Sequence, residues 1–442
     1  MMNWKQGSCC VFSCLAVIVT LGCSASFQKD RAYISNSIEE KTGGGLRPEV
    51  QADMQEIPDT VTLTDGLTVD EAIAVALWNN PVFQSELLSL GYARADIQEA
   101  RSLRNPIFSM LFPLGPKQLE FSVNAPVDFL WQRPKRVSSA NLDAEKTAEN
   151  LIQSGLAVVR DVKTSWADLE LALSWEKIGI ELTAIENEIA SISDARLRAG
   201  DISELETASY HISAGRSKET AIQYAHNADQ ESIRLRALLG NAVSLSDIRY
   251  VFSEPSLPTV NSSDTLLKNA LAARPDLRAA EIALESAGEK VGWEKSKIFA
   301  LTAVLDANGE GKEGFEMGPG LQTELPLFNW NGAGRTRAQT AFELAVQNYA
   351  MLQQHIETEV MSALNDYESY KSTYELYLSD ILPSVEDALN YAEASYATGE
   401  TSYLSLLIHK QEVIRTRMNA AEALSAVKRS MADLEYAVGY SL

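Results

Sequence analysis

Cysteine is missing from almost the whole chain. All four cysteines of the 442-residue sequence lie within its first 23 residues, at Cys9, Cys10, Cys14 and Cys23. This excludes a disulfide framework and a thiolate metal site from everything that follows. Histidine is also scarce, and the four histidines show no ligand-like spacing such as i, i+4: His211, His226, His355 and His409. With no phosphate-binding Gly-Lys-Ser/Thr motif either, the sequence predicts neither an enzyme nor a cofactor.

Basic residues are too few for a partner of high negative charge. The chain has 38 Lys and Arg against 60 Asp and Glu, which gives a formal net charge of -22. Binding to nucleic acid or to an anionic membrane surface depends on clustered Lys and Arg, so both are disfavoured partners. The carboxylates either solvate helix faces or line a path for cationic cargo, and the sequence leaves both readings open.

The only long apolar run stands at the N-terminus. It extends from Cys9 to Leu21 after the charged Lys5, and Gly22-Cys23-Ser24 follows. This pattern predicts an export signal over residues 1–22 rather than a membrane-spanning helix. Val19 to Cys23 resembles a bacterial lipoprotein cleavage box, although Thr20 replaces the usual leucine, so Cys23 is the predicted lipidation site and new N-terminus. The alternative is an ordinary signal peptide with an incidental cysteine.

The rest of the chain contains an internal duplication. Gly200 and Gly240 recur as Gly399 and Gly439, each pair 40 residues apart and framing helix-like sequence. Self-matches at fixed offset indicate a repeat architecture. We expect an extended N-terminal segment over 24–65, repeat 1 over 66–250, a linker over 251–262, and repeat 2 over 263–442.

Each repeat contains two strand-like stretches. Residues 119–129 and 315–328 alternate between apolar and polar side chains, and shorter partners precede them at 107–113 and 299–308. This period of two predicts one β-hairpin per repeat. The lengths suit membrane-spanning strands and soluble half-buried strands equally. Because an open sheet edge is not tolerated in lipid, a membrane barrel would need strands from several chains.

Very long helices follow each hairpin. They are predicted over residues 135–198 and 336–398, and in the second stretch apolar or small residues recur about every 3.6 positions, the period of a straight α-helix. Gly200 and Gly399 are placed to end these helices in the left-handed conformation. Returning helices are expected over 203–239 and 402–438. Pro383 should kink or break the second long helix.

These features together resemble the TolC-type outer-membrane efflux proteins over residues 66–442. The resemblance rests on three elements: Asn80-Pro81, the strand end Leu325-Pro326-Leu327-Phe328 leading to Gly334-Arg335, and Tyr396-x-x-Gly399-x-x-Ser402. It implies a mainly α fold with a transmembrane β part, in which a homotrimer forms a 12-stranded β-barrel continued by a periplasmic α-helical barrel. It also implies two partners, a periplasmic adaptor protein and an inner-membrane transporter driven by protons or ATP.

The resemblance assigns roles to residues near the two glycine turns. Adaptor docking is expected at the periplasmic tips, at Gly200, Asp201, Gly399 and Glu400. The narrow aperture is expected beside them, at Tyr396, Glu204 and Thr401. Thr401 stands where relatives often carry a basic residue that holds the aperture closed. Asp201 and Glu204 are equally consistent with favourable placement at a helix start.

The polar faces of the strands give a second set of candidates. If the apolar faces contact lipid, the lumen would be lined by strand acids and would prefer cations: Glu120, Asp128, Asp306, Glu316 and Glu324. The function expected is the exit duct of a tripartite efflux system in the outer membrane. The alternatives are the exit duct of a type I protein secretion system and a periplasmic helical scaffold lipoprotein without a channel. The exported substrate stays open between drug, metal ion and protein.

Overall fold

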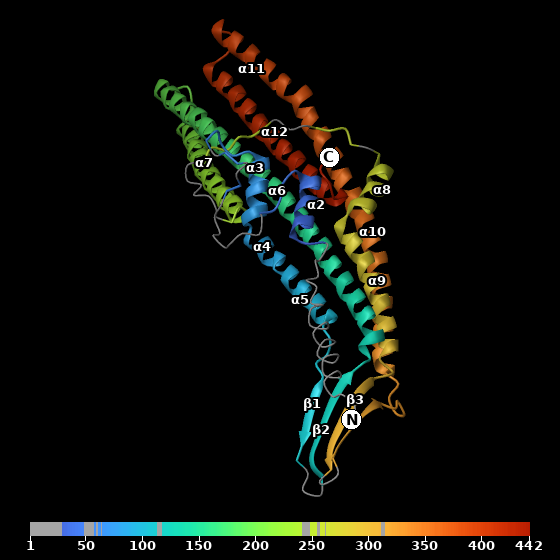
Figure 1. Ribbon diagram of the computed structural model, residues 1–442. Coiled ribbons are helices and arrows are strands. Elements are labelled where there is room, and N and C mark those ends of the chain that lie inside the picture. The colour runs from blue at the N-terminus through green and yellow to red at the C-terminus, as the bar shows by residue number, and fades with distance from the viewer. Residues whose placement is uncertain are drawn as a thin grey trace.

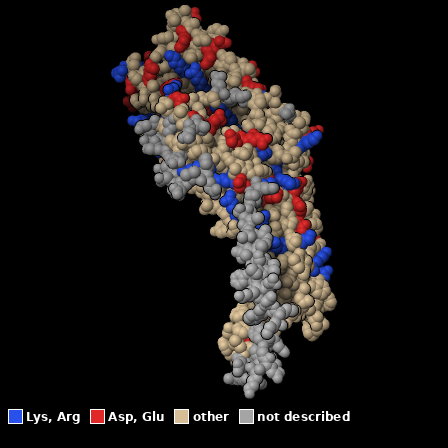
Figure 2. All heavy atoms as spheres, viewed as in Figure 1, with Lys and Arg blue, Asp and Glu red and all other residues tan. Residues whose placement is uncertain are grey.

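Long helices extend from a small sheet at one end of the molecule (Figure 1). The computed structural model describes residues 29–47, 57–58, 61–62, 64–112, 117–240, 248–253, 257–260, 262–310 and 314–442. The predicted signal over residues 1–22 and the predicted lipidation site Cys23 lie outside the described residues. Figure 2 shows acidic and basic side chains interspersed over the helical part of the visible face.

The same order of elements occurs twice. Repeat 1 contains α3 (Val69–Asn79), α4 (Pro81–Leu87), α5 (Ser89–Arg101), β1 (Ile107–Leu111), β2 (Lys117–Pro126), α6 (Phe129–Ala199) and α7 (Glu204–Leu238). Repeat 2 contains α8 (Ser263–Ala273), α9 (Pro275–Ser296), β3 (Leu301–Glu310), β4 (Gly314–Thr323), α10 (Gly332–Leu376), a π-helical turn η2 (Tyr377–Ile381), α11 (Leu382–Ala397) and α12 (Tyr403–Val438). The fold is therefore mainly helical with a few strands, as the sequence predicts.

Local sequence explains where these helices begin and break. Thr68 caps α3 in a capping box with Glu71, and Pro81 separates α3 from α4 by occupying the first turn of the new helix. Pro383 lies in the first turn of α11, directly after η2. Because proline cannot donate an amide hydrogen, the helix widens into a π turn just before Pro383, and it continues from α10 through η2 into α11 without a break.

The two hairpins form one antiparallel sheet in the order β1-β2-β3-β4. Phe121 pairs with Ala307, which pairs with Met317, so odd-numbered residues of β2, β3 and β4 share one face. Strands β2, β3 and β4 have 10 residues each, whereas β1 has 5. Neither β1 nor β4 has a second neighbour among the described residues, so each leaves one edge open.

Two strand ends differ from the sequence-based prediction. Strand β2 ends at Pro126 and β4 at Thr323, so Asp128 and Glu324 do not lie on strands. Asp128 precedes α6, is 8% exposed, and its carboxylate accepts a hydrogen bond from Gln132. The alternation continued through Val127 and Phe129 only because the first apolar residues of α6 happen to keep the same parity.

The expectation of an extended segment over 24–65 is wrong for its middle part. Helix α2 (Arg31–Thr42) occupies it, with Asp30 as N-cap and Gly43 in the left-handed conformation at its end. Ile34 and Ile38, one turn apart, are fully buried against α3 and α6 residues. The Lys41 ammonium donates to the carbonyl oxygens of Ala273 and Gly439 at 2.7 and 3.2 Å, so α2 also holds repeat 2.

Each repeat has its own hydrophobic core. The larger one combines α2, α3 and α6 around Ile38, Leu77 and Leu169, and the other combines α8, α10 and α12 around Leu266 and Tyr367. No helix in the described ranges combines the length and apolar character that crossing a bilayer requires.

A hydrogen bond conserved between the repeats joins the start of each repeat to the end of its returning helix. The Asn80 amide donates to the carbonyl oxygen of Leu238 at 3.1 Å, and the Arg274 guanidinium donates to that of Ala437 at 2.9 Å. Arg274 is at the matching position to Asn80, and Ala437 at the matching position to Leu238. The duplicated sequence therefore places the same backbone acceptor twice and meets it with different donors.

Candidate functional site

The predicted tips are two helical turns of identical backbone design. At Gly200, φ is 80° and the amides of Gly200 and Asp201 donate to the carbonyls of Leu197 and Arg196. At Gly399, φ is 78° and the amides of Gly399 and Glu400 donate to those of Tyr396 and Ser395. Two such backbone hydrogen bonds around a residue in the left-handed conformation form the Schellman motif. Both turns lie at the end of the molecule opposite the sheet (Figure 1).

The returning helices begin four residues after each glycine. Ser203 caps α7 in a capping box with Glu206, while Ser402 caps α12 through the amide of Ser405. Hydrogen bonds from the backbone and side chain of Ser203 lower the pKa of the Glu206 carboxyl. Glu204 lies in the first turn of α7, where its negative charge favours the helix start.

An aromatic pair lies beside the Gly399 turn. The rings of Tyr396 and Tyr403 are 5.1 Å apart between centroids. The Tyr403 hydroxyl donates a 2.7 Å hydrogen bond to the Glu188 carboxylate on α6, which raises the pKa of Tyr403. Tyr396, the predicted aperture residue, thus packs on a side chain that ties the α11–α12 hairpin to the α6–α7 hairpin.

A second link between the hairpins is centred on a buried carboxylate. Glu186 on α6 is 5% exposed, accepts a 3.0 Å hydrogen bond from the Ser213 hydroxyl of α7, and accepts another from the Gln411 amide of α12. Buried polar groups are costly unless they are satisfied, so this carboxylate holds three helices in a fixed relation near the tips.

The structure places the predicted tip residues at two separate turns. Asp201 and Glu204 belong to the Gly200 turn and are exposed, while Glu400 and Thr401 belong to the Gly399 turn. None of the hydrogen bonds or ion pairs found in the described part of the chain joins the acids of the first turn to the second. Sequence reasoning missed Tyr403, Glu188, Glu186 and Gln411, because their pairing depends on how the two repeats pack and leaves no local signal.

The strand acids divide into two groups. Asp306 pairs in register with Ser122, and Glu120 with Asn308, which in turn pairs with Glu316. Glu120, Asp306 and Glu316 are therefore at positions of one face, opposite the face that carries Phe121, Val123 and Leu305. Asp128 and Glu324 lie beyond the strand ends and do not belong to this set.

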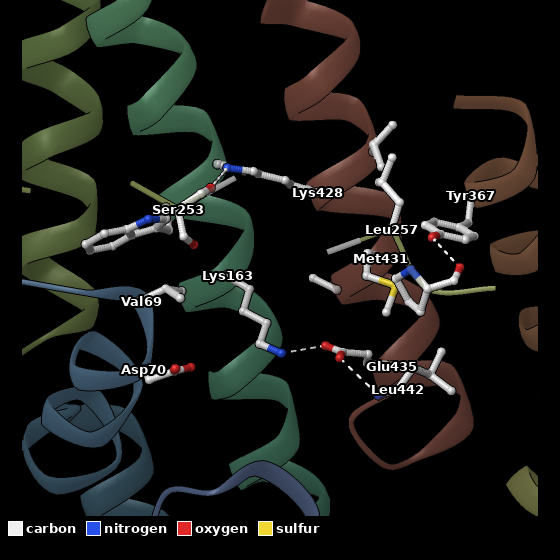
Figure 3. A pocket seen from close by; sticks show the side chains of 15 residues that line it. Val69, Asp70, Lys163, Ser253, Leu257, Tyr367, Lys428, Met431, Glu435 and Leu442 are labelled. Atoms are coloured by element: carbon white, nitrogen blue, oxygen red, sulfur yellow. Dashed lines mark hydrogen bonds and ion pairs between the residues drawn. The ribbon is translucent and has the colours of Figure 1, made fainter. Parts of the chain in front are cut away.

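A cavity of about 290 Å³ separates the two cores. Figure 3 shows Lys163 of α6 and Glu435 of α12 pointing toward one another across it, with nitrogen and oxygen 2.6 Å apart. Glu435 also accepts from the Leu442 amide, and Lys428 donates to the carbonyl of Ser253. These groups are satisfied within the chain, so the contacts around the cavity hold Ser253 and the C-terminal Leu442 against α12. Within the described ranges, no group of three or more His, Cys, Asp or Glu could hold a metal ion.

Comparisons with known proteins agree with this architecture. The family model described as "Outer membrane efflux protein" matches residues 266–440. The cation efflux system protein CusC of Escherichia coli (strain K12) is 27% identical over 457 residues, which covers 90% of this chain and 93% of CusC. The nickel-cobalt-cadmium resistance protein NccC of Alcaligenes xylosoxydans xylosoxydans is 25% identical over 64% of each chain.

The fold is shared with solved channels of this kind. A crystal structure of CusC superposes with a TM-score of 0.68 at 21% identity, covering 89% of this chain and 99% of CusC. Four observations agree with this similarity. They are the repeated hairpin-and-helix arrangement, the two Schellman turns at one end, the four-stranded sheet at the other end, and the family match within repeat 2. The chain is therefore similar to outer membrane efflux proteins, with the family match over residues 266–440 and the fold match over 89% of its length.

Proposed function

We propose that three copies of this chain form the outer-membrane exit duct of a tripartite efflux system. The duct receives substrate through a periplasmic adaptor protein from an inner-membrane transporter and releases it outside the cell. Nothing in the sequence resembles a nucleotide-binding motif, so the energy comes from the transporter. Acyl chains on Cys23 add a lipid anchor to the same membrane.

The observation that carries this proposal is the four-stranded sheet with two open edges. In β1 and β4 the exposed apolar residues include Phe108, Met317 and Leu321. An unpaired strand edge with apolar side chains is unstable in lipid and prone to aggregation in water. Pairing β1 of one copy with β4 of the next removes every edge, and three copies give a closed barrel of 12 strands.

The helices supply the periplasmic part of the duct. With 71 residues, α6 is roughly 105 Å long at 1.5 Å per residue. Three chains with two hairpins each give six tips around one pore. We assign adaptor docking to the Gly200 and Gly399 turns with Asp201 and Glu400, and the aperture to Tyr396, Glu204 and Thr401.

The proposed cargo is a metal cation. Two relatives are named for cation efflux and for nickel-cobalt-cadmium resistance. The sheet face with Glu120, Asp306 and Glu316 would line the lumen and favour cations, since rings of carboxylates select for positive charge.

Assembly can be tested with cysteines, because the chain has none after Cys23. Ile107 and Thr323 stand at the helix-facing ends of the two open strands. An Ile107→Cys/Thr323→Cys variant treated with a short bis-maleimide should give covalent dimers and trimers in outer-membrane fractions. Each single variant is the control and should give no trimer. Monomer alone from the double variant would reject the closed trimeric barrel.

Cargo is tested in a deletion strain. Loss of the gene should raise sensitivity to nickel, cobalt, cadmium or another metal cation, and the intact gene should restore resistance. Sensitivity confined to dyes, antibiotics or bile salts would replace metal by drug export. Unchanged sensitivity to all of these, with loss of a secreted protein, would favour the type I secretion duct. A protein that is recovered as a trimer but conducts no ions in planar bilayers would favour the scaffold.

A further inference from the structure

A groove opens where the helices meet the sheet in repeat 1. It holds about 400 Å³ between the end of α5 and the start of α6. Its apolar lining comes from Phe129, Leu130, Pro134 and Val137, and its basic lining from Arg101 and Arg133. In Figure 1 this corner lies at the transition from helices to strands.

Some guanidinium N–H groups at this groove have no hydrogen-bond acceptor among the described residues. Arg133 donates through Nε to the carbonyl oxygen of Arg101 at 2.8 Å, which fixes its stem and leaves its two terminal nitrogens without a hydrogen bond among the described residues. Arg136 binds the carbonyls of Ala100 and Ser102, both at 2.9 Å, and so satisfies the end of α5. Arg101 and Arg104 have no side-chain hydrogen bond or ion pair within the part of the chain that the structure describes.

Unpaired arginines are notable in a chain of net charge -22. Elsewhere many basic side chains are paired, as Lys428 is with Glu170 at 2.6 Å. Here the guanidinium groups of Arg101 and Arg133 line the same groove as Leu130, whose side chain is 66% exposed. An apolar trough with a rim of guanidinium donors matches a lipid whose acyl chain is apolar and whose headgroup is an anionic phosphate ester.

We infer that this groove binds an anionic phospholipid of the leaflet that faces the helices, with its phosphate held by Arg101 and Arg133. The inference rests on the proposed membrane duct, because only then does the sheet end lie at a bilayer surface. The net charge of the whole chain disfavours an anionic lipid, but this groove is lined by basic side chains and can bind one. The groove thereby fixes the depth of the sheet in the bilayer.

Native mass spectrometry of the full chain can test this. The protein is released from micelles that contain equal amounts of phosphatidylglycerol and phosphatidylcholine with the same acyl chains. The wild type should retain phosphatidylglycerol preferentially. Arg101→Gln should reduce that preference several-fold, because it removes one of the two guanidinium groups that hold the phosphate. The Arg101 side chain makes no hydrogen bond or ion pair within the described residues, so the fold does not depend on it.

The matched control is Arg198→Gln, which removes the same charge from an exposed position at the end of α6. It should leave the lipid preference unchanged. Equal retention of both lipids by the wild type, or an equal loss in the control, overturns the inference. Release of the lipid by millimolar inorganic phosphate would also overturn it, because the acyl trough would then contribute nothing. So would dissociation of the trimer in Arg101→Gln without a change in lipid preference, since a neighbouring copy would then occupy the groove.

Channel conductance of the same preparations separates the two proposals. Conducting wild-type trimers without a preference for phosphatidylglycerol would refute the lipid site and leave the duct intact. Wild-type protein that forms no channel in any lipid mixture would refute the duct itself.

Discussion

Four glycines with positive φ allow the cost of a left-handed turn to be separated from the cost of a close backbone approach. A Cβ added at Gly200 or Gly399 would meet nothing within 4 Å. A Cβ added at Gly240 would stand 2.1 Å from the carbonyl oxygen of Asn79 and 2.7 Å from its carbon. Gly439 is intermediate, with its nearest neighbour, Arg274 Cγ, at 3.2 Å. The four positions are therefore a graded series with nearly the same backbone conformation.

Alanine at Gly200 should cost about 1 kcal/mol of unfolding free energy, because a left-handed L-residue is penalised by roughly that amount. Alanine at Gly240 should cost roughly 2–4 kcal/mol, because the Asn79 backbone must also move, and overpacking adds about 1–3 kcal/mol. Gly439→Ala should fall between them. The measurement is the apparent midpoint of urea unfolding, monitored by circular dichroism of the purified protein in detergent.

The control is Gly215→Ala in α7, where a Cβ would also meet nothing within 4 Å and φ is helical. This change should be neutral or stabilising by up to about 1 kcal/mol, because alanine favours helix over glycine. If Gly240→Ala were no worse than Gly200→Ala, the steric part of the reasoning would be refuted. If Gly200→Ala behaved like the control, the conformational part would fail.

Three further predictions concern charged and hydrogen-bonding groups. Arg274→Met should destabilise the fold by about 3–5 kcal/mol in urea denaturation, since it leaves its carboxylate partners and a buried carbonyl unpaired; a loss below about 1 kcal/mol would contradict this. Tyr403→Phe and Glu188→Gln should each speed proteolysis at the tips, and a double variant no worse than either single one would show that they act as one link. Because the pKa of Tyr403 is raised, this link should be intact below about pH 10, the unfolded value, and be lost as the pH rises through the folded pKa. Glu120→Gln/Asp306→Asn should shift the single-channel reversal potential toward lower cation preference, and an unchanged potential would remove these acids from the lumen.

The elements that the sequence predicts well are those with a local physical cause. The tip glycines end their helices as expected because the left-handed cap is set by residues within one turn. The irregularity next to Pro383, a π turn and not a break, follows in the same way from a missing amide hydrogen. The hairpins were found because alternation is a property of consecutive residues, although their ends shifted by a few positions where Val127 and Phe129 continued the pattern by coincidence.

What the sequence could not show depends on contacts between distant segments. Helix α2 was missed because only Ile34 and Ile38 face the core in a stretch that is otherwise polar. The Tyr403–Glu188 hydrogen bond joins residues 215 positions apart, and its partners are ordinary surface types in isolation. The basic groove was hidden by an overall charge of the opposite sign.

The two repeats show which part of a duplicated plan must stay constant. Asn80 and Arg274 both bind the carbonyl at the end of their own returning helix, although one is a neutral amide and the other a buried cation that also pairs with Asp276 and Glu359. The burial of Arg274 opposes its charge, yet these carboxylates outweigh that cost and raise its pKa. Both repeats end their returning helix against the same junction, so the acceptor carbonyl occurs at matching positions. The donor can differ between the repeats as long as that buried carbonyl is satisfied, because an unpaired backbone carbonyl would be costly.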